Sequence, residues 1–126
     1  MNIRKQVFRL LSSGTAYPVF GSVAPSTAVS PYIVFSVISD ILNYTHAGFD
    51  NTARTRIQAS AYSTVSYASA VDVAGAIISA LNAAPGSYGI AIARMENELD
   101  LYNEDSKTHH IPVDFIINRE TYSTAT

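Results

Sequence analysis

The chain contains no cysteine and no tryptophan among its 126 residues. Without cysteine, neither a disulfide framework nor a thiolate metal site can form, so stability must come from packing or from association. The longest apolar runs are far shorter than the ~20 residues that cross a bilayer, and the basic start is not followed by an apolar stretch. We therefore expect neither export nor insertion into a membrane.

Charge is also scarce, since only 14% of the residues are Asp, Glu, Lys or Arg and the formal net charge is −2. This balance argues against a protein that gains affinity by neutralising many phosphates. Because 48% of the residues are hydrophobic, a domain of this size must leave apolar or small neutral surface exposed. Such surface often marks an interface with another subunit, so the composition predicts a protein that assembles.

Two segments have the apolar periodicity of an amphipathic helix. The first, over residues 2–13, stops at Gly14 and has its apolar residues at Ile3, Val7, Leu10 and Leu11. The second begins after Ser63 or Thr64, either of which can cap it, and ends near Asn82. Its expected apolar stripe consists of Tyr67, Val71, Ala74, Ile78 and Leu81.

Four segments have the composition or the alternation of β-strands. Residues 32–39 are dense in β-branched and aromatic residues, and residues 54–62, 88–94 and 111–118 alternate between two faces. Together with the helices, these strands follow the order helix, strand, strand, helix, strand, strand. This order predicts an α+β fold with a mainly antiparallel sheet of about four to five strands and both helices packed on one face.

The connecting segments are rich in turn-forming or charged residues. We expect residues 15–31 to form a loop with one brief strand, and the polar stretch 40–53 to form a long hairpin loop between antiparallel strands. Residues 96–107 hold five acidic residues and one lysine, which predicts a solvated turn or an acidic rim. We expect a single domain over residues 1–126, of which 120–126 form a loose tail.

The residues capable of chemistry do not form a catalytic or metal-binding pattern. His109 and His110 are adjacent on a predicted strand, so they point to opposite faces and cannot grip one metal ion. The acidic segment 96–107 lacks the alternating ligands and the central glycine of a calcium loop. No phosphate-cradling glycine motif and no nucleophile elbow is present. We expect no catalytic residue, no metal and no cofactor.

Two features could instead contact nucleic acid. Arg4, Lys5 and Arg9 form a small basic face on the first helix, which could touch DNA or an acidic neighbour, although a solvated face is the simpler interpretation. The eight tyrosines and five phenylalanines could provide stacking surfaces, but they are dispersed and lack a basic groove between them. We assign the aromatic residues to core and interface positions.

Five short motifs occur in order along most of the chain. They are the helix Ile3–Leu11, Gly-Ser-Val-Ala-Pro at 21–25, Pro-Tyr-Ile-Val-Phe at 31–35, Arg-Ile-Gln-Ala-Ser-Ala-Tyr at 56–62, and Ile-Ser-Ala-Leu at 78–81. Their order and spacing, together with the chain length, resemble the tail-completion, or tail-terminator, family of long-tailed, siphovirus-like bacteriophages. The carboxy-terminal third fits this family only in pattern, with an acidic turn and then an alternating strand.

The resemblance implies a structural virion protein and not an enzyme. Members of the family form a ring, typically a hexamer, that ends the tail tube and joins it to the head or neck. The implied partners are further copies of the chain, the major tail-tube protein and a head–tail connector or neck protein. Double-stranded DNA would pass through the lumen without specific binding. The protein would assemble in the cytoplasm of the bacterial host and remain in the tail or neck of the virion.

Candidate interface residues follow from this role. Arg54 and Arg56 lie on the polar face of a predicted strand, and Asn43 and His46 lie in the segment expected to form the long hairpin loop. The acidic segment contributes Glu96, Glu98 and Asp100. A ring needs interfaces that close after a fixed rotation, and an exposed sheet edge or a long hairpin can provide them. We expect the hairpin and the acidic segment to make contacts along the ring axis.

Two other functions stay open. A head-completion or connector-stopper protein of the phage neck would bind the portal or its adaptor, whereas a terminator would bind the tail-tube protein. A small oligomeric enzyme would draw four residues together from different copies, namely His109, His110, Asp100 and Arg94. Perturbed histidines or carboxylates in a pocket would favour that alternative.

Overall fold

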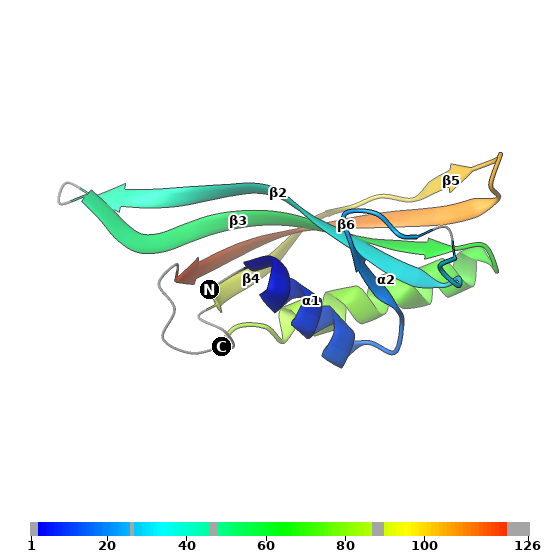
Figure 1. The fold of residues 1–126 in the computed structure, drawn as a ribbon, viewed down its shortest axis with the longest axis horizontal. Coiled ribbons are helices and arrows are strands. Elements are labelled where there is room, and N and C mark those ends of the chain that lie inside the picture. Colours follow the sequence, from blue (N-terminus) through cyan, green and yellow to red (C-terminus); the bar gives the residue numbers. More distant parts are fainter. Residues whose placement is uncertain (1–2, 26, 46–47, 87–89, 121–126) are drawn as a thin grey trace.

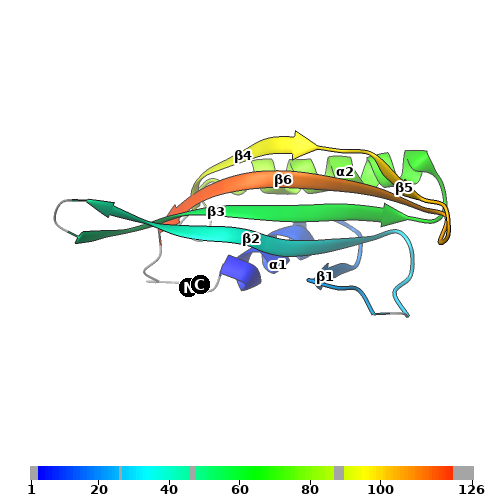
Figure 2. The same cartoon turned by 90° about the horizontal axis from the view of Figure 1, so that it is seen from above.

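The computed structural model describes residues 3–25, 27–45, 48–86 and 90–120. The elements in chain order are α1 Ile3–Gly14, β1 Val19–Gly21, β2 Tyr32–Thr45, β3 Gly48–Ser63, α2 Tyr67–Asn82, β4 Ile90–Glu98, β5 Leu101–Asn103 and β6 Thr108–Glu120. One twisted sheet runs along the length of the molecule, and both helices lie against the same face of it (Figure 1, Figure 2). The predicted α+β class and the predicted order of the main elements are confirmed.

The strands form one mixed sheet in the order β1-β2-β3-β6-β4, with β5 paired to the beginning of β6. β1 runs parallel to β2, and every other pair is antiparallel. The sheet has six strands instead of the four to five predicted. β1 is the brief strand expected within residues 15–31, whereas the three-residue β5 lies in the segment expected to be a turn and was not predicted. Segments that short show no readable alternation. None of the described helices is long and apolar enough to cross a membrane.

The core lies between the helices and the two central strands, β3 and β6. These strands pair in a register that brings Ile57 beside Phe115, and the buried residues on their helix-covered side are Ile57, Ala59, Ala61, Ile111, Val113, Phe115 and Ile117. α2 packs across both strands. Each fully buried large apolar side chain contributes about 1.5–3 kcal/mol relative to an exposed one. We call the other side of the sheet the open face; it carries Tyr32, Arg54, Arg56, Gln58, Tyr62 and His110.

The first helix has the predicted amphipathic pattern. Ile3, Val7 and Leu11 are buried, whereas Leu10 is only partly buried and Gln6 is buried among them. α1 packs on α2 and beneath β1 and the edge of β2. The contact with α2 is close at Gly14, because a Cβ atom there would lie only 2.8 Å from the Cβ of Ala80.

The second helix differs from the prediction in its cap and in its buried face. Ser66 is the N-cap, and its Oγ accepts a hydrogen bond from the Ser69 N–H at 3.1 Å. Ser63 cannot act as the cap because it ends β3. The side chains facing the core are Ala70, Val73, Ala74, Ile77, Ala80 and Leu81. Of the expected stripe, Ala74 and Leu81 are buried, Ile78 is only partly buried, and Tyr67 and Val71 are exposed, so the stripe was wrong by about one residue over most of its length. Small alanines suit a helix that lies close to the sheet.

The segment 40–53 is not the long loop that its polar composition predicts. β2 continues to Thr45 and β3 begins at Gly48, so the two strands form a long antiparallel hairpin, which extends beyond the rest of the sheet (Figure 1). The backbone pairing along this hairpin, together with the apolar residues Ile41 and Leu42, favours strand over loop despite the polar residues of the segment. At the other terminus, Glu120 is the last residue of β6, and residues 121–126 of the expected tail lie outside the described part.

The close approach of the helices predicts opposite effects at two glycines. Gly14→Ala should destabilise the fold by about 1–3 kcal/mol, because the new methyl group must displace Ala80. Gly75→Ala should stabilise it by about 0.5–1 kcal/mol, because Gly75 lies within exposed helix and nothing approaches its position within 4 Å. Urea unfolding curves of both variants measure this difference. Equal effects of the two substitutions would contradict the helix contact.

Candidate functional site

The hairpin of β2 and β3 is anchored to β6 by a partly buried ion pair. Arg119 is 8% exposed, and its Nη2 donates to Asp40 Oδ2 at 2.7 Å. Thr55 joins both residues, since its hydroxyl donates to Asp40 Oδ1 at 2.6 Å and accepts from Arg119 Nε at 3.0 Å. The three side chains belong to β2, β3 and β6. This network therefore fixes the register of three strands where the hairpin leaves the sheet.

The arginines predicted from sequence lie together on the open face, close to the base of the hairpin. Arg54 and Arg56 are both exposed, and with Ser39, Ile41 and Ile116 they line a small cavity of about 130 Å³. Asn43 lies in the outer part of β2, and its side chain is outside the described part. His46 is outside the described residues altogether.

His109 and His110 point to opposite faces of the sheet, as the sequence predicts. His110 lies on the open face, where its ring stacks on Tyr62 at 4.2 Å between centroids, and Tyr62 in turn stacks on Tyr32 at 5.3 Å. Phe20 of β1 closes the row with an edge contact to Tyr32 at 6.0 Å. This aromatic row crosses β1, β2, β3 and β6, so it binds the strands together near one end of the open face.

Burial changes the ionisation of two members of this row. It lowers the pKa of His110, whose Nε2 is buried and has no hydrogen-bond partner among the described residues. It also raises the pKa of Tyr62, with a smaller contribution from neighbouring Tyr32. A cavity of about 380 Å³ adjoins the row and is lined in addition by Asn103, Ser106 and Thr108. The rings stack on one another across the strands, so the row acts as a packing feature of the open face.

His109 lies on the helix-covered side, in a second aromatic group. Its ring contacts Tyr102 of β5 at 4.7 Å and Tyr67 of α2 at 5.8 Å between centroids. The Tyr67 hydroxyl donates to Asp100 Oδ2 at 2.7 Å, and this hydrogen bond is the main reason that the pKa of Tyr67 is raised. The group joins the beginning of α2 to β5 and to the turn before it.

The acidic candidates Glu96, Glu98 and Asp100 lie at the edge of the sheet formed by β4 and β5, far across the sheet from β2. All three are exposed, which confirms the predicted solvated character of this segment. Glu96 Oε1 accepts a hydrogen bond from Arg94 Nη2 at 2.9 Å. The structure therefore does not bring the acidic candidates together with Arg54 and Arg56, which lie on the open face of the central strand.

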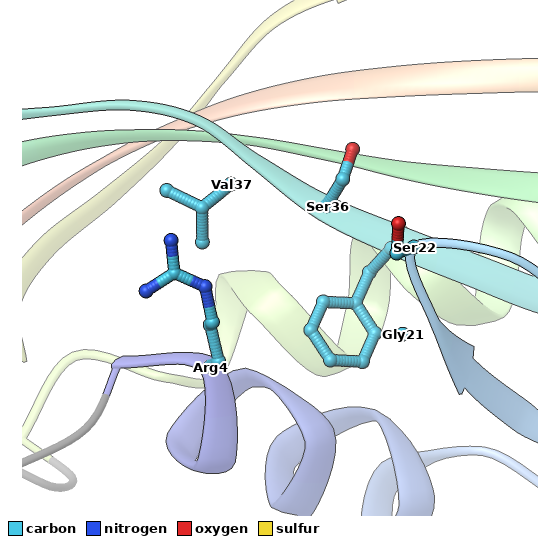
Figure 3. Close-up of a pocket in the computed structure, with 6 residues that line it drawn as sticks. Arg4, Gly21, Ser22, Ser36 and Val37 are labelled. Carbon is cyan, nitrogen blue, oxygen red and sulfur yellow. The ribbon is translucent and has the colours of Figure 1, made fainter.

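The structure also has a groove that the sequence did not predict. It lies between α1 and the edge of the sheet formed by β1 and β2, across the sheet from the acidic candidates. One cavity of about 440 Å³ is lined by Arg4, Gly21, Ser22, Phe35, Ser36 and Val37, and a second of about 450 Å³ by Arg4, Lys5, Phe8, Arg9, Gly21 and Phe35. The two cavities share three residues and so form one groove. Figure 3 shows the Arg4 side chain rising from α1 toward Val37, with Gly21 and Ser22 on the other side. The sequence feature that could have indicated this groove is Phe8, an apolar residue among the basic residues of α1, which is exposed in the structure.

The described residues contain no group of three or more His, Cys, Asp or Glu side chains that could hold a metal ion. The features gathered on the surface are instead a projecting hairpin, an open face, an acidic edge and a basic groove. Each presents exposed apolar side chains or charge on the sheet, which are features common in surfaces that contact other macromolecules.

Comparison with known families agrees with this interpretation. The family model described as tail completion protein gp17 matches residues 6–118. The chain belongs to this family. A subunit in the solved structure of the virion of a native gene transfer agent particle has the same fold. Its TM-score is 0.67 at 18% sequence identity, and the match covers 90% of this chain and 91% of that one. No curated protein shows significant similarity to the chain.

Membership of the tail-completion family assigns the chain a structural role at the end of a phage tail, and therefore a place in the tail or neck of a virion. The resemblance read from the sequence is confirmed on this point. The match covers the elements from α1 to β6, so it includes the helix-covered core, the hairpin and both sheet edges.

The burial of His110 predicts an acid-sensitive fold. Because the folded state disfavours the imidazolium, the unfolded chain binds the proton first, and stability should fall as the pH drops below the ordinary value of 6.5. His110→Phe keeps the ring stack but removes the titrating group, so it should reduce the loss of melting temperature between about pH 7.5 and about pH 5.5. His109→Phe, on the other face, is the matched control. An unchanged pH dependence in His110→Phe would contradict the assignment.

Proposed function

We propose that the chain forms a closed ring, a hexamer, that ends the tail tube and joins it to the neck of the virion. The observation that carries this proposal is the match of the tail-completion family over residues 6–118. Each copy would contribute a single domain to the ring and would bind no cofactor. The partners would be further copies of the chain, the tail-tube protein and a neck connector. DNA would cross the lumen without specific binding, in keeping with the low net charge of −2.

The shape of the subunit supports separate contacts along the ring axis and around the ring. The hairpin of β2 and β3 extends at one end of the long axis, and the turn between β5 and β6 lies at the other end (Figure 1). Arg54, Arg56 and the backbone of Asn43 belong to the hairpin end and would meet one axial neighbour; we keep His46 as a candidate for the same contact from the sequence alone. Glu96, Glu98 and Asp100 lie along the side of the sheet, so we reassign them from axial contacts to contacts between copies.

An enzymatic role is less well supported than a structural one. Within one copy, His109 and His110 lie on opposite faces, Asp100 binds the Tyr67 hydroxyl, and Arg94 pairs with Glu96. An interface site would have to draw these residues out of contacts that they already make. We therefore propose that the chain has no catalytic activity.

The proposal is tested by adding the purified chain to growing tubes of its tail-tube protein. A terminator stops elongation and leaves ring-shaped density at tube ends in electron micrographs. A connector-stopper protein would instead bind the portal or its adaptor and leave tube growth unchanged. That result would overturn the terminator role while keeping the family assignment.

Charge reversal at the base of the hairpin should separate assembly from folding. Arg54→Glu and Arg56→Glu should each weaken ring formation or tube capping, because both side chains are exposed beside a cavity on the open face. Each should change the free energy of unfolding by less than about 0.5 kcal/mol, as for other surface substitutions. Lys107→Glu makes the same charge change at the opposite end of the subunit. Normal assembly of both arginine variants would remove this surface from the interface.

A further inference from the structure

The two lateral edges of the sheet carry opposite charge. The edge of α1, β1 and β2 presents Arg4, Lys5 and Arg9, all exposed, and α1 has no acidic residue. We call this the basic edge. The edge of β4 and β5 presents exposed Glu96, Glu98 and Asp100, where the one nearby cation of the described residues, Arg94, is already paired. We call this the acidic edge. Figure 2 shows the two edges on opposite sides of the molecule.

Both edges also have unpaired backbone and exposed apolar side chains. β1 covers the outer side of β2 only from Ile33 to Phe35, and no described strand pairs with it beyond that point. β4 likewise has no described strand on its outer side. The large exposed apolar residues are Phe8, Ile38 and Leu42 at the basic edge and Met95, Leu99 and Leu101 at the acidic edge. Open edges of this kind favour pairing with another chain.

The groove and the acidic edge lie at the same level along the strands. One row of cross-strand partners crosses the whole sheet, in the order Gly21, Phe35, Ala59, Val113 and Glu98. The row begins in the lining of the groove and ends at the acidic edge. A second copy placed beside the first therefore needs no shift along the strands to bring these surfaces together. A head-to-tail contact without a shift along the axis closes into a ring when its rotation divides the full circle, whereas a contact with a shift generates a helical filament.

We propose that the acidic edge of one copy binds the groove at the basic edge of the next copy, head to tail, and that this contact closes the ring. The inference rests on the proposed function and adds the contacting surfaces. Leu99 and Phe8 lie in the apolar centre of the contact, and Glu98 and Asp100 face Lys5 and Arg9 at its rim. Two identical edges repel each other, so the charges exclude a symmetric dimer and select the head-to-tail arrangement.

The test uses two variants that reverse one edge each. The first carries Lys5→Glu and Arg9→Glu, so both of its edges are acidic. The second carries Glu98→Lys and Asp100→Lys, so both of its edges are basic. Each alone should assemble at least about tenfold more weakly than the wild type. An equimolar mixture should recover assembly, because the two variants can alternate around an even-numbered ring. Analytical ultracentrifugation and micrographs of tube ends measure both effects.

A matched control and melting curves exclude trivial causes. Glu104→Lys with Asp105→Lys makes the same charge change at the turn between β5 and β6, away from the lateral edge, and should leave the contact between copies intact. All variants should keep the melting temperature of the wild type within a few degrees, since the substituted side chains are exposed. The hydrogen bond from Tyr67 that Asp100→Lys removes is also exposed, so its loss should cost little stability. If the control loses assembly as strongly as the reversed edges, general charge and not the edge contact is responsible, and the inference is wrong.

The remaining outcomes distinguish the inference from the proposed function. If both edge variants form rings as well as the wild type does, the edge contact is wrong. It is also wrong if the variants fold but their mixture does not assemble. Either result leaves the ring and the terminator role standing. A wild-type chain that forms no oligomer, either free or on tube ends, overturns the proposed function and the edge contact together.

Discussion

The pairing of β3 with β6 is the constraint on which the rest of the structure depends. Both strands turn their apolar residues to the same side, with Ile57 beside Phe115 and Ala59 beside Val113. Both helices must therefore pack on that side, where α2 covers the central strands and α1 meets it at Gly14. In the described part of the chain both helices cover one face of the sheet, which leaves the open face for contacts with other subunits. The outer sides of β2 beyond Phe35 and of β4 pair with no described strand.

The one-sided core also explains how a small subunit can offer several distinct surfaces. The partly buried Arg119–Asp40 pair and Thr55 hold the hairpin at one end, and the aromatic row of Tyr32, Tyr62 and His110 joins the strands at the other. These two features keep the sheet in one register over its length, so the edges stay in a fixed relation. A ring needs this property, since a small error in the angle between its two contact surfaces would accumulate around the circle.

The sequence predicts the main elements well where alternation or helical periodicity is strong. The alternation of 54–62 and 111–118 correctly assigns the two faces of the sheet, and the opposite orientation of His109 and His110 follows from it. The groove and the outer half of the hairpin could not be predicted, because they depend on the pairing of distant segments. The alanine-rich face of α2 was misassigned since hydrophobicity favours Tyr67 and Val71, whereas close packing on the sheet favours small side chains.

In the proposed ring, the acidic edge of each copy meets the basic edge of the next. Hydrogen–deuterium exchange of the free chain and of the chain assembled on tube ends tests this contact directly. We predict new protection of backbone amides in two places at once, along the outer side of β2 beyond Phe35 together with α1, and along β4 to Leu101. Unchanged exchange at both edges, with protection confined to the open face, would contradict it.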